Sequence, residues 1–146
     1  FLVKRNFIDV YISKKRALLM TETHSNPWID VDTTDFKIDF NKDEFINQKR
    51  DYDEWYRNIT DYLITKGKPY TTLYYDEFHI LDIKGQQVLI KEKLEQFING
   101  CCLNLTVTEV EHVLKKQDKS LDYKTKLNNY SEFMDFICNR GLSLST

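Results

Sequence analysis

Glycine and proline are scarce in this chain of 146 residues, which has four glycines and two prolines. No glycine stands in a G-x-x-x-x-G-K-[ST] pattern, so the sequence holds no phosphate loop of that kind. An apolar run long enough to cross a bilayer as a helix is also missing. We therefore expect a protein with no membrane partner.

Cysteine is equally sparse, with an adjacent pair, Cys101 and Cys102, and a third residue, Cys138. An odd number without a C-x-x-C spacing suits neither a disulfide framework nor a zinc ribbon, so we expect reduced thiols and a cytoplasmic protein. No two histidines stand at i, i+4, so no metal site is expected. The net charge of −2 gives no general attraction to nucleic acid.

What the sequence does contain is typical of a single globular domain spanning 1–146. Hydrophobic residues make up 41% of the chain and charged residues 30%. The apolar run Phe1–Lys4 predicts a buried parallel strand. Asn6 is the expected N-cap of a helix predicted over residues 7–20. Residues 21–40 show no clear hydrophobic periodicity and are predicted to be irregular, apart from a short strand at their end.

Further along the chain, a capping box from Asn41 to Glu44 opens a long amphipathic helix, and Gly67 ends it. Residues 70–75 are rich in Thr and Tyr and predict a second strand. A loop is predicted around Gly85. It precedes a helix that runs to Asn99 and is stopped by Gly100, with Leu89, Leu94, Phe97 and Ile98 facing inward. Another helix is predicted from Thr106, an irregular polar stretch at 116–128, and a last helix from Asn129 to Gly141.

Long helical connections between strands favour a parallel sheet. We therefore predict an α/β fold with a partial parallel sheet of two or three strands and dominant helices. The strand at Phe1–Lys4 is expected to pair in parallel with the strand near Leu73. Two or three strands are few for such a sheet, so further strands are expected upstream of Phe1.

The stretch from Arg5 to Ser13 is the most informative for function. It places an arginine where a strand ends and a serine about two turns into the next helix. Ligands bind at this edge of open α/β sheets, and a guanidinium matches phosphate with a planar fork of donors. The alternative is structural: Arg5 would pair with Asp9, and Ser13 would bond back to its own helix.

This stretch resembles the 3′-phosphate motif of sulfotransferases. Arg5, Asn6, Asp9 and Ser13 match that motif in type and spacing, whereas Phe7 stands where the family has proline. The resemblance implies that Arg5 and Ser13 hold the 3′-phosphate of the donor, 3′-phosphoadenosine 5′-phosphosulfate (PAPS).

Two later stretches are also similar to this family. Leu73–Phe78 resembles its strand ending in Tyr-Glu-Asp-Leu, with the two acids exchanged. Tyr75 then matches the tyrosine near the donor's adenosine, although core packing, above all of Tyr74, is the simpler explanation of a tyrosine-rich strand. The polar stretch after Lys115 resembles the C-terminal segment of bacterial and marine sulfotransferase-like proteins, without the family's Arg-Lys-Gly loop.

The resemblance implies the C-terminal part of a sulfotransferase fold and transfer of a sulfuryl group from PAPS, without a metal, to a small-molecule, glycan or peptide acceptor. Arg5, Ser13 and Tyr75 would bind the donor. The family's phosphosulfate loop and catalytic base would precede Phe1, so catalytic residues are not assigned, and the chain alone is expected to be inactive. The alternatives are a non-catalytic nucleotide-binding module or a helical interaction protein, and homo-oligomers remain open.

Overall fold

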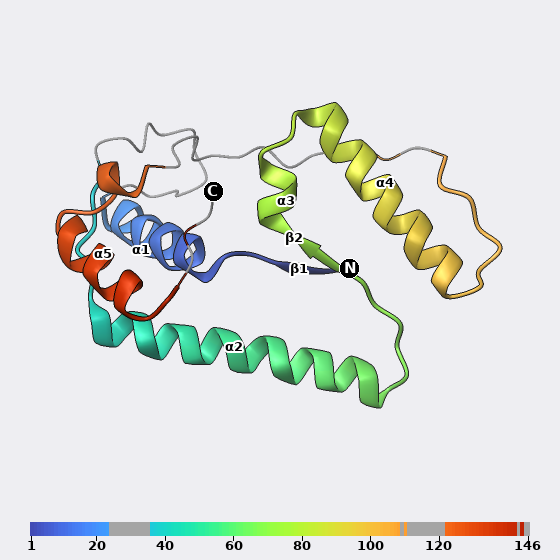
Figure 1. The fold of residues 1–146 in the computed structure, drawn as a ribbon, viewed down its shortest axis with the longest axis horizontal. Helices are drawn as coiled ribbons and strands as arrows, with labels where there is room; N and C mark the ends of the chain where they lie inside the picture. Colours follow the sequence, from blue (N-terminus) through green and yellow to red (C-terminus); the bar gives the residue numbers. More distant parts are fainter. Residues whose placement is uncertain (24–35, 109, 111–121, 143, 145–146) are drawn as a thin grey trace. The chain divides into compact units, whose positions relative to one another are not determined.

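The computed structural model describes residues 1–23, 36–108, 110, 122–142 and 144 (Figure 1). The chain divides into two compact units, and each is described by itself. The first unit comprises Phe1–Arg5 and Trp55–Lys116, and the second comprises Asn6–Glu54 and Gln117–Thr146.

The sheet of the first unit consists of two short parallel strands. β1 (Leu2–Lys4) pairs with β2 (Thr72–Tyr74), and Val3 lies opposite Leu73. The predicted parallel pairing is therefore confirmed, and so is an α/β fold with dominant helices and a small parallel sheet. β2 is shorter than the strand predicted over 70–75, because Tyr75 already begins a short helix, α3 (Tyr75–His79).

The long helix α2 (Lys42–Thr65) has residues in both units. Asn41 caps its start, since its Oδ1 accepts a hydrogen bond of 2.9 Å from the Glu44 N–H. Beyond its end, Gly67 has φ +59°, and the N–H groups of Gly67 and Lys68 donate back to carbonyls of the last turn. Only glycine adopts this left-handed backbone without cost, so the predicted stop is confirmed in physical detail.

Helix α4 (Ile83–Gly100) begins earlier than the sequence pattern predicts. Gly85 does not lie in a loop but in the first turn, where its N–H donates to Asp82 Oδ1 at 2.7 Å. A capping aspartate immediately before the helix outweighs the weak helix propensity of one glycine. Gly100 is the last residue of the helix, in line with the predicted stop, but the left-handed residue beyond the last turn is Cys102.

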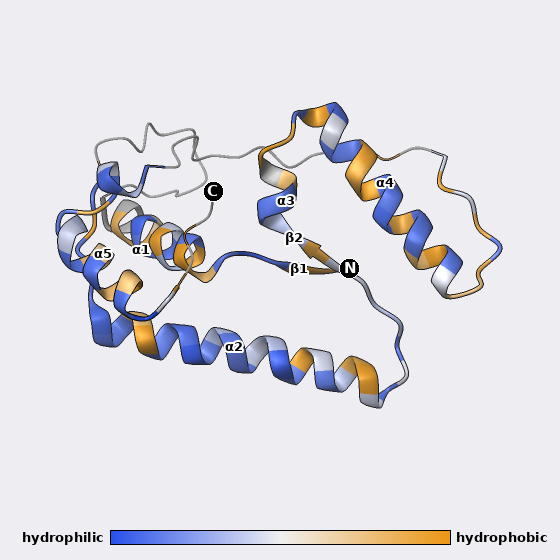
Figure 2. Ribbon diagram, in the orientation of Figure 1, coloured by the Kyte–Doolittle hydropathy of each residue, from blue (hydrophilic) through white to orange (hydrophobic). Residues whose placement is uncertain are grey.

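Helix α4 buries none of its residues fully. The four side chains predicted to face inward are only half-buried: Leu89, Leu94, Phe97 and Ile98. Figure 2 shows apolar residues recurring along the whole helix between charged ones. Among the described residues of this unit, the buried apolar side chains are Leu73 and Phe78, so its core is small.

The second unit begins with helix α1 (Phe7–Thr23). Asn6 caps it as predicted, with its Oδ1 accepting from the Ile8 N–H at 2.9 Å. The helix runs three residues into the stretch predicted to be irregular, and residues 24–35 of that stretch lie outside the described part. The short strand predicted at its end is reduced to a single bridge, in which Ile38 pairs with Leu127.

The C-terminal part of the second unit holds a short 3₁₀ helix, η1 (Tyr123–Thr125), and helix α5 (Tyr130–Asn139). The last helix agrees with its prediction. Of the stretch predicted to be irregular and polar, the described residues 122–128 form only η1 and a single bridge, but Tyr123 and Leu127 within them are buried. Thr106–Thr108 are not helical, and the rest of the helix predicted from Thr106 lies almost wholly outside the described residues.

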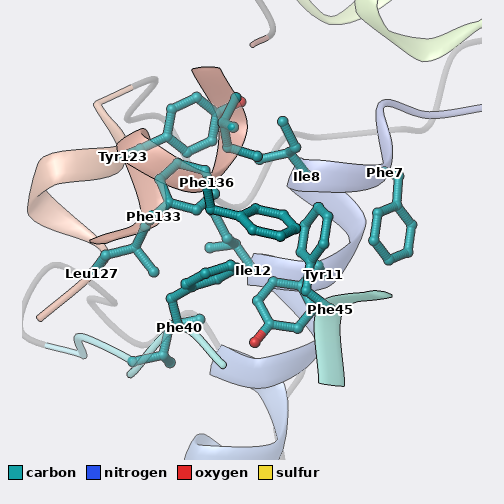
Figure 3. Close-up of a cluster of buried hydrophobic side chains, with 12 residues drawn as sticks. Phe7, Ile8, Tyr11, Ile12, Phe40, Phe45, Tyr123, Leu127, Phe133 and Phe136 are labelled. Atoms are coloured by element: carbon teal, nitrogen blue, oxygen red, sulfur yellow. The ribbon is translucent and has the colours of Figure 1, made fainter. Parts of the chain in front are cut away.

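A dense aromatic cluster forms the core of the second unit (Figure 3). Helices α1 and α5, the start of α2 and the segment around Phe40 supply its side chains. The rings meet edge-on or tilted, and Phe40 lies 5.3 Å from both Phe133 and Phe136, centroid to centroid. The members of the cluster are Phe7, Ile8, Tyr11, Ile12, Ile38, Phe40, Phe45, Tyr123, Leu127, Phe133, Phe136 and Ile137.

The side chain of Asn129 forms the hydrogen bonds with the Phe40 backbone that a neighbouring strand would otherwise form. Its Oδ1 accepts from the Phe40 N–H at 2.7 Å, and its Nδ2 donates to the Phe40 carbonyl at 2.9 Å and to Glu132 at 2.8 Å. The two segments are far apart in the sequence, so this amide fixes α5 to the start of α2.

We expect Asn129→Asp to destabilise the second unit by about 2–3 kcal/mol, because a carboxylate cannot donate to the Phe40 carbonyl. Urea unfolding monitored by circular dichroism measures the loss. The matched control is Asn128→Asp, since Asn128 is exposed and its amide reaches only Asp39, at 3.0 Å. An equal loss in both variants would contradict the role assigned to Asn129.

Candidate functional site

The candidate site lies where the two parallel strands end. Lys4 and Tyr74 are register partners and the last residues of their strands, so Arg5 and Tyr75 leave the same edge of the sheet. The Arg5 guanidinium carbon lies 4.7 Å from the centre of the Tyr75 ring. The structure thus brings together two of the three predicted site residues.

Stacking on Tyr75 orients the Arg5 guanidinium without removing its charge. A cation within about 6 Å of an aromatic ring is attracted to the ring face. Arginine carries five N–H donors in a rigid plane and stays protonated, and stacking leaves the edges of that plane for in-plane hydrogen bonds. Both side chains are half-buried. This arrangement suits an anion that offers two neighbouring oxygen acceptors, such as a phosphate.

A second tyrosine supports the strand that carries Arg5. The Tyr56 hydroxyl donates to the Val3 carbonyl, and the Lys4 ammonium lies 5.7 Å from the centre of the Tyr56 ring. Consecutive cations, Lys4 and Arg5, therefore each lie against a tyrosine ring. Sequence reasoning missed Tyr56, because no local pattern relates a helical residue to a strand more than fifty positions earlier.

The short helix α3 begins with the site residue Tyr75. Tyr75 is tilted against Phe78, with ring centroids 6.4 Å apart, and Phe78 is only 3% exposed. The buried Phe78 therefore anchors the turn of chain that carries Tyr75. By contrast, Tyr74 is 46% exposed, so the interpretation of Tyr74 as a core residue is wrong.

Ser13, the third predicted site residue, belongs to the second unit. It lies on an exposed position of α1. On the same helix the Asp9 carboxylate accepts a hydrogen bond of 2.8 Å from the Tyr123 hydroxyl. Asp9 thus has a structural partner in η1, and the role of Ser13 remains a prediction from the resemblance.

The titratable groups with shifted pKa values lie at the junction of α1 and α2. Burial raises the pKa of the Tyr11 hydroxyl, which is fully enclosed and hydrogen-bonds the backbone of Asn41. The Glu44 carboxylate, 2.7 Å from the Lys15 ammonium, raises the pKa of Lys15 by its hydrogen bond. These groups join two helices and form a structural cluster.

In the described part of the chain, no group of three or more His, Cys, Asp or Glu side chains is placed to hold a metal ion. Within the same residues, every helix is too short or too polar to cross a membrane. His24 and His112 lie outside the described residues, as do Lys115, Lys116 and Lys119.

Neither a protein-family model, nor a curated protein, nor a solved structure matches this chain.

Proposed function

We propose that this chain binds the 3′-phosphoadenosine end of PAPS and forms the 3′-phosphate half of a sulfotransferase donor site. The observation that supports the proposal best is the stacked pair of Arg5 and Tyr75 at the carboxyl edge of two parallel strands. The sequence around both residues resembles the sulfotransferase family, and the strands would belong to the C-terminal part of that fold.

The chemistry of the pair supports an adenosine 3′-phosphate in particular. Arg5 offers charge and paired donors to phosphate oxygens, which bind better to a guanidinium than to a neutral donor. Tyr75 offers an aromatic surface next to that charge. An adenosine 3′-phosphate combines an anion and a purine ring, and a neighbouring arginine–tyrosine pair can contact both parts.

In such a transfer the donor's bisphosphate is the leaving group, and the acceptor is a hydroxyl or an amine. Negative charge develops on the leaving phosphate, so cationic groups stabilise the transition state, as they do in phosphoryl transfer. Arg5 would anchor the remote 3′-phosphate and position the donor. Arg5 would not act on the reacting sulfuryl group itself.

Isothermal titration calorimetry of the chain with adenosine 3′,5′-bisphosphate tests this function. Adenosine 5′-monophosphate is the matched control ligand, because it differs only in lacking the 3′-phosphate. One charge-assisted contact is worth about 1.5–3 kcal/mol, so we expect the bisphosphate to bind about tenfold more tightly or better. Equal binding of the two nucleotides, or binding of neither, would overturn the proposal.

Ser13 is assigned to the same phosphate by the resemblance alone. We expect Ser13→Ala to weaken bisphosphate binding about fivefold, because a neutral hydroxyl contributes about 1 kcal/mol. The control is Ser131→Ala, which removes an equally exposed hydroxyl from α5. Unchanged affinity in Ser13→Ala would remove Ser13 from the site and leave Arg5 and Tyr75 in place.

One observation favours a second candidate, a helical interaction module. Helix α4 is 18 residues long and has no fully buried side chain, while Ile83 and Val88 are more than half exposed. Apolar surface of this kind often marks a protein contact. This candidate would be selected if sedimentation over a range of protein concentrations showed self-association and calorimetry showed no nucleotide binding.

A further inference from the structure

The adjacent cysteines Cys101 and Cys102 form the cap that ends helix α4. Cys101 is the C-cap residue, with φ −90° and ψ 2°, and Cys102 follows with φ +52°. The Cys102 N–H donates to the Asn99 carbonyl at 3.1 Å, and the Leu103 N–H donates to the Ile98 carbonyl at 3.0 Å. These two bonds close the motif that normally has glycine at its left-handed position.

A cysteine in this position is unfavourable for the backbone. Left-handed φ brings a Cβ close to the neighbouring carbonyl oxygen, and residues other than Gly, Asn and Asp rarely adopt it. Cys102 is the single non-glycine residue with positive φ in the described part of the chain. Gly67 occupies the equivalent place after α2, so the same protein uses the favourable residue at one helix end and a thiol at the other.

Both thiols are free and reach the surface. Cys102 is exposed, Cys101 is half-buried, and neither is in a disulfide. Consecutive Cα atoms are about 3.8 Å apart, which is below the span of about 4.4–6.8 Å that an unstrained disulfide needs. A disulfide between neighbours is therefore strained and easily reduced, as reversible disulfides are.

The hydrogen bonds of this cap cannot be kept when Cys101 and Cys102 form a disulfide. With ψ near 0° at Cys101 and positive φ at Cys102, the two Cβ atoms lie on opposite sides of the peptide plane between them. A disulfide requires the Cβ atoms to approach within about 4.5 Å. Ring closure therefore requires rotation about ψ of Cys101 or φ of Cys102. Rotation about ψ of Cys101 moves the N–H groups of both Cys102 and Leu103 from their acceptors, and rotation about φ of Cys102 moves that of Leu103.

We propose that Cys101 and Cys102 form a redox-sensitive dithiol whose oxidation opens the C-terminal cap of α4. The oxidant is a low-molecular-weight disulfide of the glutathione type. The Cys102 thiolate attacks one sulfur of that disulfide and releases the first thiol. The Cys101 thiolate then attacks the Cys102 sulfur and expels the second thiol. Two electrons and two protons pass from the cysteines to the oxidant, which leaves as two thiols.

Titration of the chain with mixtures of oxidised and reduced glutathione tests the chemistry, with alkylation and intact mass as the readout. We expect wild type to lose two hydrogens, and peptide mapping to place the bond between Cys101 and Cys102. Cys138→Ser is the matched control, because Cys138 is exposed but has no neighbouring thiol: it should form the same Cys101–Cys102 bond as wild type and lack only the glutathione that the isolated Cys138 thiol takes up. Cys101→Ser should instead stop at the mixed disulfide and gain the mass of one glutathione.

Hydrogen exchange tests the coupling to the cap. The amides of Cys102 and Leu103 should exchange about fivefold faster in the oxidised chain, the effect expected when bonds worth about 1 kcal/mol are lost. The amides of Gly67 and Lys68, in the equivalent motif after α2, should not change. The proposal is overturned if both cysteines stay glutathionylated separately, stay unmodified, or pair with Cys138. A Cys101–Cys102 disulfide that leaves the two cap amides unchanged also overturns it.

Discussion

Replacing Arg5 with alanine is expected to weaken the binding of adenosine 3′,5′-bisphosphate about tenfold or more. The change removes a charge-assisted contact worth about 1.5–3 kcal/mol to the 3′-phosphate. It also leaves the Tyr75 ring without the guanidinium that lies 4.7 Å from its centre. Binding of adenosine 5′-monophosphate should change little, since this ligand lacks the phosphate that Arg5 is proposed to hold.

Two further variants separate charge from geometry in this experiment. Arg5→Lys keeps the charge but not the planar fork, so it should recover only part of the lost affinity. Arg57→Ala is the control, because Arg57 is an exposed arginine of α2 in the same unit. Calorimetry gives the affinities, and circular dichroism checks that each variant folds. Equal affinities for wild type, Arg5→Ala and Arg5→Lys would refute the assignment of Arg5.

The largest effect on stability is expected for Phe133→Ala, which should cost about 3–5 kcal/mol. Phe133 is fully buried in the second unit and contacts Phe40, Tyr123 and Tyr130. Truncation leaves a cavity lined by rings that are held by their own neighbours and cannot collapse into it. Hydrogen exchange of the α1 amides reports the opening of this unit directly, and urea unfolding gives the free energy.

The control for this variant is Phe1→Ala, because the Phe1 side chain is 55% exposed. Its loss should be below about 1 kcal/mol, as for most surface substitutions. Phe133→Leu keeps most of the volume and should fall between the two. If Phe1→Ala and Phe133→Ala destabilised the chain equally, the aromatic cluster would not be the main source of stability in the second unit.

Features encoded within a few residues could be predicted from the sequence. Asn6 and Asn41 were identified as N-caps, because a short polar side chain and the first helical N–H groups meet locally. The strand near Phe1 and its parallel partner near Leu73 followed from apolar runs joined by helical connections. The edge position of Arg5 followed from the same argument, whereas Tyr75 was placed at the site by the resemblance alone.

Features that depend on distant contacts could not be predicted in this way. Tyr123 and Leu127 lie in a polar stretch. Their side chains are buried by contacts with Asp9, Ile38 and other residues more than eighty positions away. The stacking of Arg5 on Tyr75 depends on the register of two strands, which the pattern does not fix to a single residue. The sequence pattern predicts a loop at Gly85, because a glycine is typical of turns. In the structure the capping aspartate before it outweighs the low helix propensity of glycine.

The contact between Tyr11 and Asn41 has a consequence for the order of folding. Asn41 donates its backbone N–H to the Tyr11 oxygen at 3.2 Å, thirty residues away, and its own side chain caps α2. The first turn of α2 is therefore stabilised by a group that arrives only when α1 has docked. Nucleating a helix costs more than extending it. Tyr11→Phe should accordingly slow refolding of the second unit, measured by stopped-flow fluorescence, as well as destabilise it, and slower refolding would place this contact in the transition state.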